Sequence, residues 1–412
     1  MTIQLLPEGW TEVRLGEVAS VSRGASPRPI ASSRWFSESS NVGWVRIADL
    51  GRSDGLILKA TTQRLSPDGI ARSRFLQPGT LIMSIAATVG VPIVTGIPAC
   101  IHDGFVAIER LRGVDQSYLL YTLKSLESEL RSAGQTGSQS NVNTEIVNNL
   151  RVKMPPIKEQ VSIAASLEDI DQLIITLEHL IAKKQSIKQG MMQQLLTGKT
   201  RLAGFSTPWS RSTVGNIADV KTGPFGSALH ESDYVSDGTP IITVEHLGER
   251  GVVSDEAPMV SDADRHRLRA YSLRAGDVVF SRVGSIDRNA LISRAEEGWL
   301  FSGRLLRVRF DRKQVDPAFM SAQFHAKPFR EAVRSVAVGQ TMPSLNTAIL
   351  RGIAVDLPSL IEQKAIGKAA SDLNGDLDLL EHRLLKARSI KQGMMQELLT
   401  GRTRLPIEEA IT

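Results

Sequence analysis

Two stretches of the chain, 155–202 and 358–405, are near-copies of each other and constrain the fold more than any other feature. The alignment needs no gap, since each position of the first stretch corresponds to the position 203 residues later. The agreement is closest over Ser186–Leu202 and Ser389–Leu405, which differ at only two positions. A repeat period this long indicates duplicated domains rather than a solenoid of short repeats.

Each copy has the pattern of a long helix with one apolar seam. The seam residues recur at alternating steps of four and three, which is the spacing of helices that wind around each other. They are Ile163, Leu167, Ile170, Ile174, Leu177 and Ile181 in the first copy, and Ile366, Ala370, Leu373, Leu377, Leu380 and Leu384 in the second. A helix of about 40 residues would be about 60 Å long at roughly 1.5 Å per residue. The partner of each seam is predicted to be the other copy; a coil that only dimerises the protein is the alternative.

Proline and glycine predict where these helices begin and end. Pro155 and Pro358 mark the starts, because proline is tolerated in the first turn of a helix. Gly198 and Gly401 mark the ends, because glycine readily adopts the left-handed conformation that closes a helix. The sequence therefore predicts two helices with the same bounds in each copy.

The duplication continues more faintly outside the helices. The segment WVRIADL near the start corresponds to IITVEHL, and LQPGTLIMS corresponds to LRAGDVVFS. The segment around Gly104 is aligned with the segment around Gly303. Short apolar runs bounded by Gly and Pro predict strands, and Asp115–Leu130 and Asp316–Val333 predict one helix each.

The predicted fold is therefore α+β, with two similar globules and two long helices in a pseudo-two-fold repeat. We expect the two helices to form an antiparallel coiled coil that separates the globules. The expected domains are a first globule at 1–154, a central helix at 155–202, a second globule at 203–357 and a C-terminal helix at 358–412.

Composition narrows the class of protein. The chain has 412 residues, of which 42% are hydrophobic and 23% charged, which is typical of a globular protein. No secretory leader or membrane span is apparent, and the single cysteine, Cys100, fits a reducing cytoplasm. We predict that Cys100 is a small core residue. The net charge of +5 and the isoelectric point near 9.3 favour a polyanionic partner.

The sequence contains no complete catalytic motif that we recognise. Gly198, Lys199 and Thr200 resemble the end of a phosphate loop, but that loop requires a glycine where Gln193 stands. The seven histidines show no metal-binding spacing. The chain is therefore expected to be non-catalytic, to bind no metal and to hold no cofactor of its own.

Polar loops that differ between the two halves point to binding instead. Arg, Lys, Gln, Asn, Ser and Thr are the side chains that hold phosphates and contact base edges. The loops around 84–92 and 281–289 contrast most, since the first is nearly uncharged and the second carries several ionic residues. The candidate DNA-binding residues are Arg23, Ser26, Arg28, Arg46, Arg72, Arg74, Ser138, Gln139 and Asn141 in the first half, and Lys221, Thr222, Ser227, Arg282, Ser285, Arg288, Asn289, Gln340 and Thr341 in the second. The alternative for any one of them is an ordinary polar surface position.

The chain resembles the specificity subunit of type I restriction–modification systems. The resemblance rests on a heptad helix that begins with Glu-Gln and ends in SIKQGMMQ-(Q/E)-LLTG-(K/R)-TRL, present twice. It implies that each globule is a target-recognition domain for one half of a split DNA sequence. It also implies partners: double-stranded DNA, two modification subunits that bind S-adenosylmethionine, and restriction subunits that use ATP and Mg²⁺. The segments expected to dock those subunits contain Lys188, Gln189, Met191, Met192, Leu195 and Leu196, and Lys391, Gln392, Met394, Met395, Leu398 and Leu399.

The residues support the same function without the resemblance. Two similar modules on a rigid spacer address two DNA sites at a fixed separation, as dimeric binders do with half-sites. Because the two sets of loops differ, the predicted target is bipartite and asymmetric. Two other classes stay open: a stand-alone sequence-specific DNA-binding protein without enzyme partners, and a coiled-coil scaffold that binds no DNA.

Overall fold

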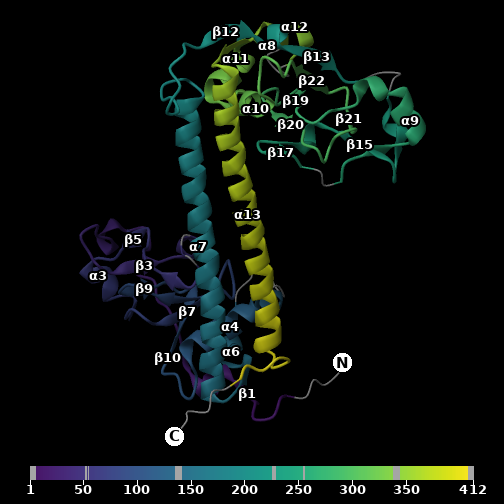
Figure 1. Ribbon diagram of the computed structural model, residues 1–412. Helices are drawn as coiled ribbons and strands as arrows, with labels where there is room; N and C mark the ends of the chain where they lie inside the picture. The colour runs from purple at the N-terminus through teal and green to yellow at the C-terminus, as the bar shows by residue number, and fades with distance from the viewer. Residues whose placement is uncertain are drawn as a thin grey trace. The chain divides into compact units, whose positions relative to one another are not determined.

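The computed structural model of the chain describes residues 6–51, 53, 55–134, 142–224, 229–253, 256–336 and 344–406 (Figure 1). The chain divides into two compact units. The first consists of residues 1–178 and 383–412, and the second of residues 179–382. Each unit thus combines one globule with the beginning of one long helix and the end of the other.

The globule of the first unit runs from β1 to β11. Its strands are β1 (Thr11–Arg14), β2 (Ser20–Arg23), β3 (Gly43–Val45), β4 (Ile57–Leu58), β5 (Gln63–Arg64), β6 (Arg74–Leu76), β7 (Leu81–Ser84), β8 (Pro92–Thr95), β9 (Ala99–Ile101), β10 (Phe105–Glu109) and β11 (Arg151–Met154). Its helices are α1 (Leu15–Val18), the 3-10 turn η1 (Ser33–Trp35), α2 (Ile47–Leu50), α3 (Pro67–Ile70), α4 (Gln116–Ser125), α5 (Glu127–Gly134) and α6 (Thr144–Asn148). The long helix α7 (Ile157–Leu195) follows.

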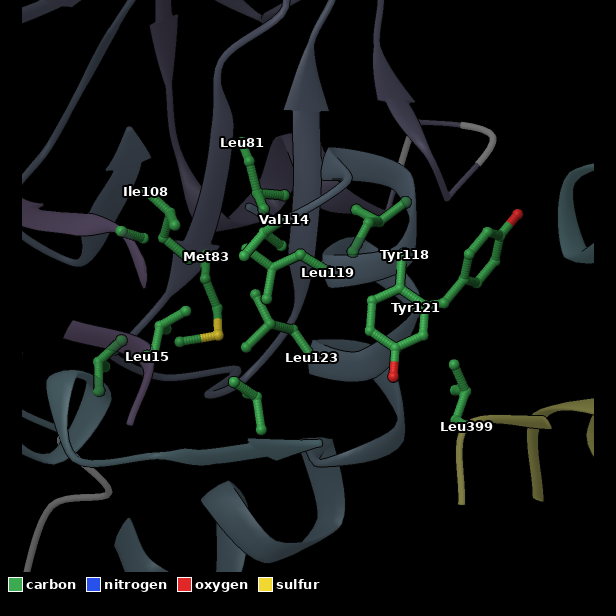
Figure 2. Packing of buried hydrophobic residues seen from close by; sticks show 14 of the residues in the cluster. Leu15, Leu81, Met83, Ile108, Val114, Tyr118, Leu119, Tyr121, Leu123 and Leu399 are labelled. Carbon is green, nitrogen blue, oxygen red and sulfur yellow. The ribbon is translucent and has the colours of Figure 1, made fainter. Parts of the chain in front are cut away.

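The larger sheet of this globule, ordered β2-β10-β7-β8-β4, is covered on both faces. Successive residues of a strand point to opposite faces. Leu81 and Met83 of β7 accordingly face Leu119 and Leu123 of α4, as Figure 2 shows. Ile82, between them in sequence, belongs to a second cluster with residues of the smaller sheet, which is ordered β5-β3-β9-β6. Continuous apolar strands are thus explained by burial on two sides.

The second globule repeats this plan. Its strands are β12 (Ser210–Thr213), β13 (Ala218–Thr222), β14 (Tyr234–Val235), β15 (Thr239–Ile242), β16 (Leu247–Gly248), β17 (Gly251–Val252), β18 (Met259–Val260), β19 (Val278–Ser281), β20 (Asn289–Leu291), β21 (Leu300–Phe301), β22 (Leu305–Phe310) and β23 (Ala354–Leu357). Its helices are α8 (Val214–Ile217), η3 (Glu231–Asp233), η4 (Val244–His246), α9 (Asp262–Arg267), η5 (Arg269–Tyr271), α10 (Pro317–His325), α11 (Lys327–Val336) and α12 (Thr347–Gly352), and α13 (Leu360–Leu398) follows.

The sheets of the second globule correspond to those of the first. One has the order β13-β22-β19-β20, and the other has the order β14-β18-β15-β21. Val278 and Phe280 of β19 pack in one cluster with Phe319 and Phe324 of α10. Val279, between them, packs in another cluster on the opposite face. The predicted α+β class and its duplication are confirmed.

Two details of the predicted globules were wrong. The single helices expected over 115–130 and 316–333 are each two helices. In the second globule the break precedes Pro328, because proline lacks an N–H and fits only the first turn of α11. The predicted caps are confirmed, since Asp115 accepts a hydrogen bond from the N–H of Tyr118 and Asp316 from that of Phe319. Cys100 is fully buried, as predicted.

The two long helices pair antiparallel within each unit. In the first unit Asp171 contacts Lys391 at 2.5 Å and Glu178 contacts Arg388 at 2.6 Å, so numbers rise along α7 while they fall along α13. In the second unit Lys184 pairs with Asp376. Three of the predicted seam residues, Ile170, Leu373 and Leu384, are half-buried, and the other nine are buried. Gly198 and Gly401 have φ of +67° and +74°, as expected of residues that close a helix.

Each helix start is held by a buried carboxylate. In the first unit Glu159 is fully buried and accepts hydrogen bonds from Nε and Nη2 of Arg404, at 3.0 and 2.7 Å, and from Trp10 Nε1 at 3.2 Å. In the second unit Glu362, equally buried, accepts two bonds of 2.5 Å from Arg201. The arginine at the end of one helix therefore fastens the start of the other.

The glutamine that follows each carboxylate ties the helix to its globule. Gln160 accepts a hydrogen bond from the N–H of Asp115 at 2.9 Å and donates to Pro155 O at 2.8 Å. Gln363 does the same with Asp316 and Pro358, at 3.0 and 2.9 Å. The repeated Glu-Gln pair thus has a structural role, which is to join helix, globule and the opposite helix end.

Candidate nucleic-acid interface

A glycine in the first unit brings the loop after β2 onto the turn between β9 and β10. A Cβ atom at Gly24 would lie 2.1 Å from the carbonyl oxygen of His102, so only glycine fits there. The N–H of Gly24 donates to Phe105 O at 2.9 Å, and that of Ala25 donates to Ile101 O at 3.1 Å. These contacts place residues 23–28, hereafter the basic loop, directly against the β9–β10 turn.

Three candidate residues of the basic loop converge on one acid in that turn. Arg23 Nε donates to the backbone oxygen of Asp103 at 2.8 Å. Ser26 Oγ donates to Asp103 Oδ1 at 2.8 Å, and Arg28 Nη2 donates to Oδ2 at 3.0 Å. Burial alone would raise the pKa of Asp103, but the Ser26 hydrogen bond and the nearby charges outweigh it, so the pKa is lowered. Asp103 is therefore ionised at neutral pH and organises the loop.

The other candidates of the first unit surround this cluster. Arg72 is exposed, and its neighbour Ser73 donates to Ala25 O at 2.7 Å, which attaches that segment to the basic loop. Arg46 is exposed and donates to Gln63 Oε1 at 3.0 Å. Arg74 is half-buried in an ion pair with Glu109, at 2.5 Å, and is therefore less available to a ligand.

His102 in the same turn is neutral in this arrangement. Its Nδ1 accepts a hydrogen bond of 2.7 Å from the N–H of Gly104, so that nitrogen carries no proton. The 3.5 Å separation between Nδ1 and Asp103 is consequently a close approach and not an ion pair. Burial lowers the pKa of His102, in agreement with the neutral form.

The second unit repeats the close contact of Gly24, with different side chains next to it. A Cβ atom at Gly223 would lie 2.1 Å from Ser302 O, and the N–H of Gly223 donates to Leu305 O. Lys221 Nζ donates to Ala270 O at 2.9 Å and lies 4.4 Å from the ring centroid of Tyr271. Thr222 is half-buried in β13. Lys221 thus lies next to the segment that follows α9.

The turn between β21 and β22 differs from its counterpart in charge. Leu305 N–H donates to Ser302 O at 3.0 Å, as Phe105 N–H does to His102 O. This correspondence places Gly303 where the first unit has Asp103, and Arg304 where it has Gly104. The sequence alignment of Gly104 with Gly303 was therefore wrong by one residue. The first unit carries an acid at this turn, and the second carries an exposed arginine.

The loop between β19 and β20 contains the remaining described candidates. Ser285 is exposed and Arg282 is half-buried. Arg288 Nη2 donates to Leu247 O at 2.6 Å, which ties the loop to the β16–β17 hairpin. Asn289 is only 1% exposed and sits within β20, so it is a structural residue and not a base-contacting one.

Asp287 gives this loop a rigid base. It accepts hydrogen bonds from Arg330 Nε at 2.9 Å and Arg334 Nη2 at 2.7 Å, both on α11. Burial would raise the pKa of Asp287, but these guanidinium groups lower it overall. In the first unit the matching loop places Ile85 and Val89 in the apolar core, which explains its lack of charge.

Basic residues on α9 and η5 were not predicted. Arg265, Arg267 and Arg269 are all exposed, and Arg269 directly precedes Ala270 and Tyr271, which Lys221 contacts. The run DADRHRLRAYSLR, which begins at position 262, has the charge pattern that could have identified them. Six candidates lie outside the described residues: Ser138, Gln139, Asn141, Ser227, Gln340 and Thr341.

The helix-end segments are mostly buried within their own units. Met192, Leu195 and Leu196 belong to the apolar cluster of the second unit, with Met191 packed against it. Leu398 and Leu399 belong to that of the first unit, with Met394 and Met395 packed against it, and Leu399 is seen in Figure 2. The buried side chains attach each helix end to its globule, which is a different role from the predicted docking. Subunit docking stays a prediction that depends on exposed residues such as Gln189 and Gln392.

The two lysines of these segments lie among acids. Lys391 contacts Asp171 at 2.5 Å, and Tyr121 Oη donates to the other oxygen of Asp171 at 2.8 Å. Lys188 is half-buried, and burial lowers its pKa while Glu249 and Glu381 oppose the change. Both lysines therefore interact with acidic residues of their own units.

The described part of the chain shows neither a metal-binding cluster nor a membrane-spanning helix. It contains no group of three or more His, Cys, Asp or Glu side chains placed to hold a metal ion. None of its helices combines the length and the apolar character that a membrane span requires.

Comparison with known proteins agrees with the resemblance seen in the sequence. A sequence profile described as the type I restriction modification DNA specificity domain matches residues 7–189. The type I restriction enzyme MjaVIII specificity subunit of Methanocaldococcus jannaschii is 22% identical, over 97% of this chain and 94% of its own. Both matches are to specificity subunits of type I restriction–modification systems, the family that the sequence resembles. A second relative, the putative MjaX specificity subunit of the same organism, is 23% identical over 71% of this chain and 69% of its own.

Solved structures agree on the fold of this chain. The S subunit of a type I system from M. genitalium covers 96% of this chain and 98% of its own, with a TM-score of 0.66 at 14% identity. A chain from a study of complex assembly and conformational transition of the type I R-M system covers 97% of this chain and all of its own, with a TM-score of 0.56 at 18% identity. The resemblance noted in the sequence is confirmed.

Proposed function

We propose that this chain is a specificity subunit that reads a bipartite, asymmetric DNA target, with one half-site bound by each globule. The observation that carries the proposal is the closely packed glycine that follows β2 and again follows β13. The backbone contacts of Gly24 and Gly223 are the same, whereas the charged side chains around them differ. Two related domains that bind different DNA sequences require a shared backbone framework with different polar side chains on it.

The charges of each loop region suit a nucleic acid. Arg23, Arg28, Arg46 and Arg72 are exposed around the β9–β10 turn of the first unit. Guanidinium groups neutralise phosphates and bind guanine edges with two hydrogen bonds. The serine and threonine hydroxyls beside them add contacts to base or backbone. The second unit offers Lys221 and the three arginines of α9 and η5.

We further propose that the chain contributes the address and the scaffold, and no bond-making residue. Two modification subunits would dock on exposed faces of α7, α13 and their ends, and restriction subunits would join that core. S-adenosylmethionine would then belong to the modification subunits, and ATP and Mg²⁺ to the restriction subunits. The helices would set the spacer, so removing two turns from both should shorten it without changing the bases read.

The test is a genome-wide map of adenine methylation in cells that express the neighbouring modification subunit with or without this chain. The expected result is a two-part, non-palindromic motif that disappears when the chain is absent. Arg28→Ala should weaken the methylation that depends on the first half-site. Arg151→Ala should not, because Arg151 pairs with Glu12 and has no hydrogen bond or ion pair with the basic loop among the described residues. An unchanged map with an assembled complex would favour a stand-alone DNA-binding protein instead.

A further inference from the structure

Every polar group of Asp103 forms a hydrogen bond with the basic loop. Its carboxylate accepts from Ser26 Oγ and Arg28 Nη2, its carbonyl accepts from Arg23 Nε, and its N–H donates to Ser26 Oγ at 3.3 Å. These contacts join positions about 75 to 80 residues apart in sequence. One acid therefore holds three of the proposed DNA-contacting side chains.

The turn that contains Asp103 forms without help from its carboxylate. The turn is closed by the bond from Phe105 N–H to His102 O at 3.0 Å and by that from Gly104 N–H to His102 Nδ1 at 2.7 Å. The second unit makes the corresponding turn, with Leu305 N–H bound to Ser302 O, although Gly303 occupies the position of Asp103. The fold of such a globule thus does not require an acid at this position.

A carboxylate is also an unexpected group to find on a surface that faces phosphates. Its charge repels DNA, and the second unit presents Arg304 in the same turn. The acid is explained if orientation of the arginines matters more than total charge. Arginine has a flexible stem, so an arginine fixed before binding loses less freedom when it forms paired hydrogen bonds. The side chain of Arg28 stays 71% exposed while Asp103 holds it, so a ligand can still reach it.

We propose that Asp103 is a positioning residue for the first half-site, which orients Arg23, Ser26 and Arg28 and thereby sets the base discrimination of that half-site. The inference rests on the proposed reading of DNA by the two globules. Asp103 itself touches the loop and acts on DNA through it. The second unit has Gly303, and not an acid, at the matching position of the turn.

The experiment compares the full chain, in complex with its modification subunits, with an Asp103→Ala variant. Binding is measured to the target and to duplexes that carry one substitution in the first or the second half-site. Discrimination within the first half-site should fall about tenfold, the order of one lost bidentate contact. Affinity for unrelated DNA should be unchanged or higher, because a negative charge has been removed, and discrimination within the second half-site should be unchanged.

Two further variants separate positioning from folding. Asp103→Asn retains an acceptor oxygen and should keep part of the discrimination, and Asp103→Gly copies the second unit and should behave as Asp103→Ala does. Asp68→Ala is the matched control, since Asp68 also pairs with an arginine on this globule, Arg34, but has no contact with the basic loop among the described residues. It should leave both half-sites unaffected.

The inference is overturned if discrimination within the first half-site survives all three Asp103 variants. It is equally overturned if specific and unrelated DNA lose affinity together along with a lower melting temperature, since that marks a purely structural residue. Failure of the proposed function looks different, because the unaltered complex would then show no discrimination within either half-site.

Discussion

Removal of the two arginines that fasten the helix starts should destabilise the two units unequally. Arg201 and Arg404 occupy corresponding positions, and each donates two hydrogen bonds to a carboxylate that is 0% exposed. Breaking a buried ion pair by removing one partner costs roughly 3–5 kcal/mol, because the remaining charge is left without compensation. Substitution of either residue by alanine is therefore expected to open the start of the opposite helix.

The surroundings predict which substitution is worse. The side chain of Arg404 is 41% exposed and that of Arg201 is 23%, so water replaces the first more readily. Glu159 also keeps its hydrogen bond from Trp10, whereas the indole N–H of Trp209, at the corresponding position, has no partner among the described residues. Within that range, Arg201→Ala should therefore cost about 4–5 kcal/mol and Arg404→Ala about 3 kcal/mol.

Hydrogen exchange of the full chain measures both effects. Exchange suits a chain with two compact units, because it reports the opening of each helix start separately. Arg151→Ala is the control, since Arg151 forms an exposed pair with Glu12 and should change local opening by at most about 0.5 kcal/mol. If Arg201→Ala opened the start of α13 no more than this control, or if Arg404→Ala were the more damaging change, the reasoning would be refuted.

Three further predictions concern other sites. Burial lowers the pKa of His325 from 6.5 to about 4, so the folded second unit disfavours the protonated imidazole. The free energy of unfolding should therefore be highest above pH 6.5 and about 2 kcal/mol lower at pH 5. Urea titrations at the two pH values should show this fall, and His325→Gln should abolish it. Gly24→Ala places a Cβ atom 2.1 Å from a carbonyl oxygen, so it should displace the basic loop and abolish discrimination of the first half-site while sparing the second, in the same binding assay. Leu167→Ala should cost about 2–5 kcal/mol in urea unfolding because Leu167 is fully buried, whereas Leu173→Ala, at a position 47% exposed on the same helix, should stay within about 0.5 kcal/mol.

The long helices were predictable because their signals are local. Heptad spacing, proline at the start and glycine at the end determine the bounds, and α7 and α13 follow them closely. The duplicated α+β globules also follow from short apolar runs between turn residues. The two helices that proved to be four show the limit, since a capped start predicts where a helix begins but not where it breaks.

The binding residues were less predictable because they depend on contacts between distant segments. Nothing near Arg28 in the sequence indicates that Asp103 will hold it, and nothing near Asn289 indicates that β20 will bury it. The leucines of the helix ends were assigned to a partner protein because an apolar repeat indicates burial without saying against what. Leu398 and Leu399 are in fact buried against the globule of the first unit.

The first unit is built from both ends of the chain, which affects how it folds during synthesis. Its globule is translated first, yet Leu398, Leu399 and Arg404 complete it, and a Cβ atom at Gly401 would lie 2.5 Å from Pro7. About 200 residues of the second unit emerge from the ribosome in between. At roughly 5–20 residues per second, that delay is on the order of 10–40 seconds. For that interval the nascent first globule exposes the apolar surface that the end of α13 later covers, which makes it a substrate for chaperones.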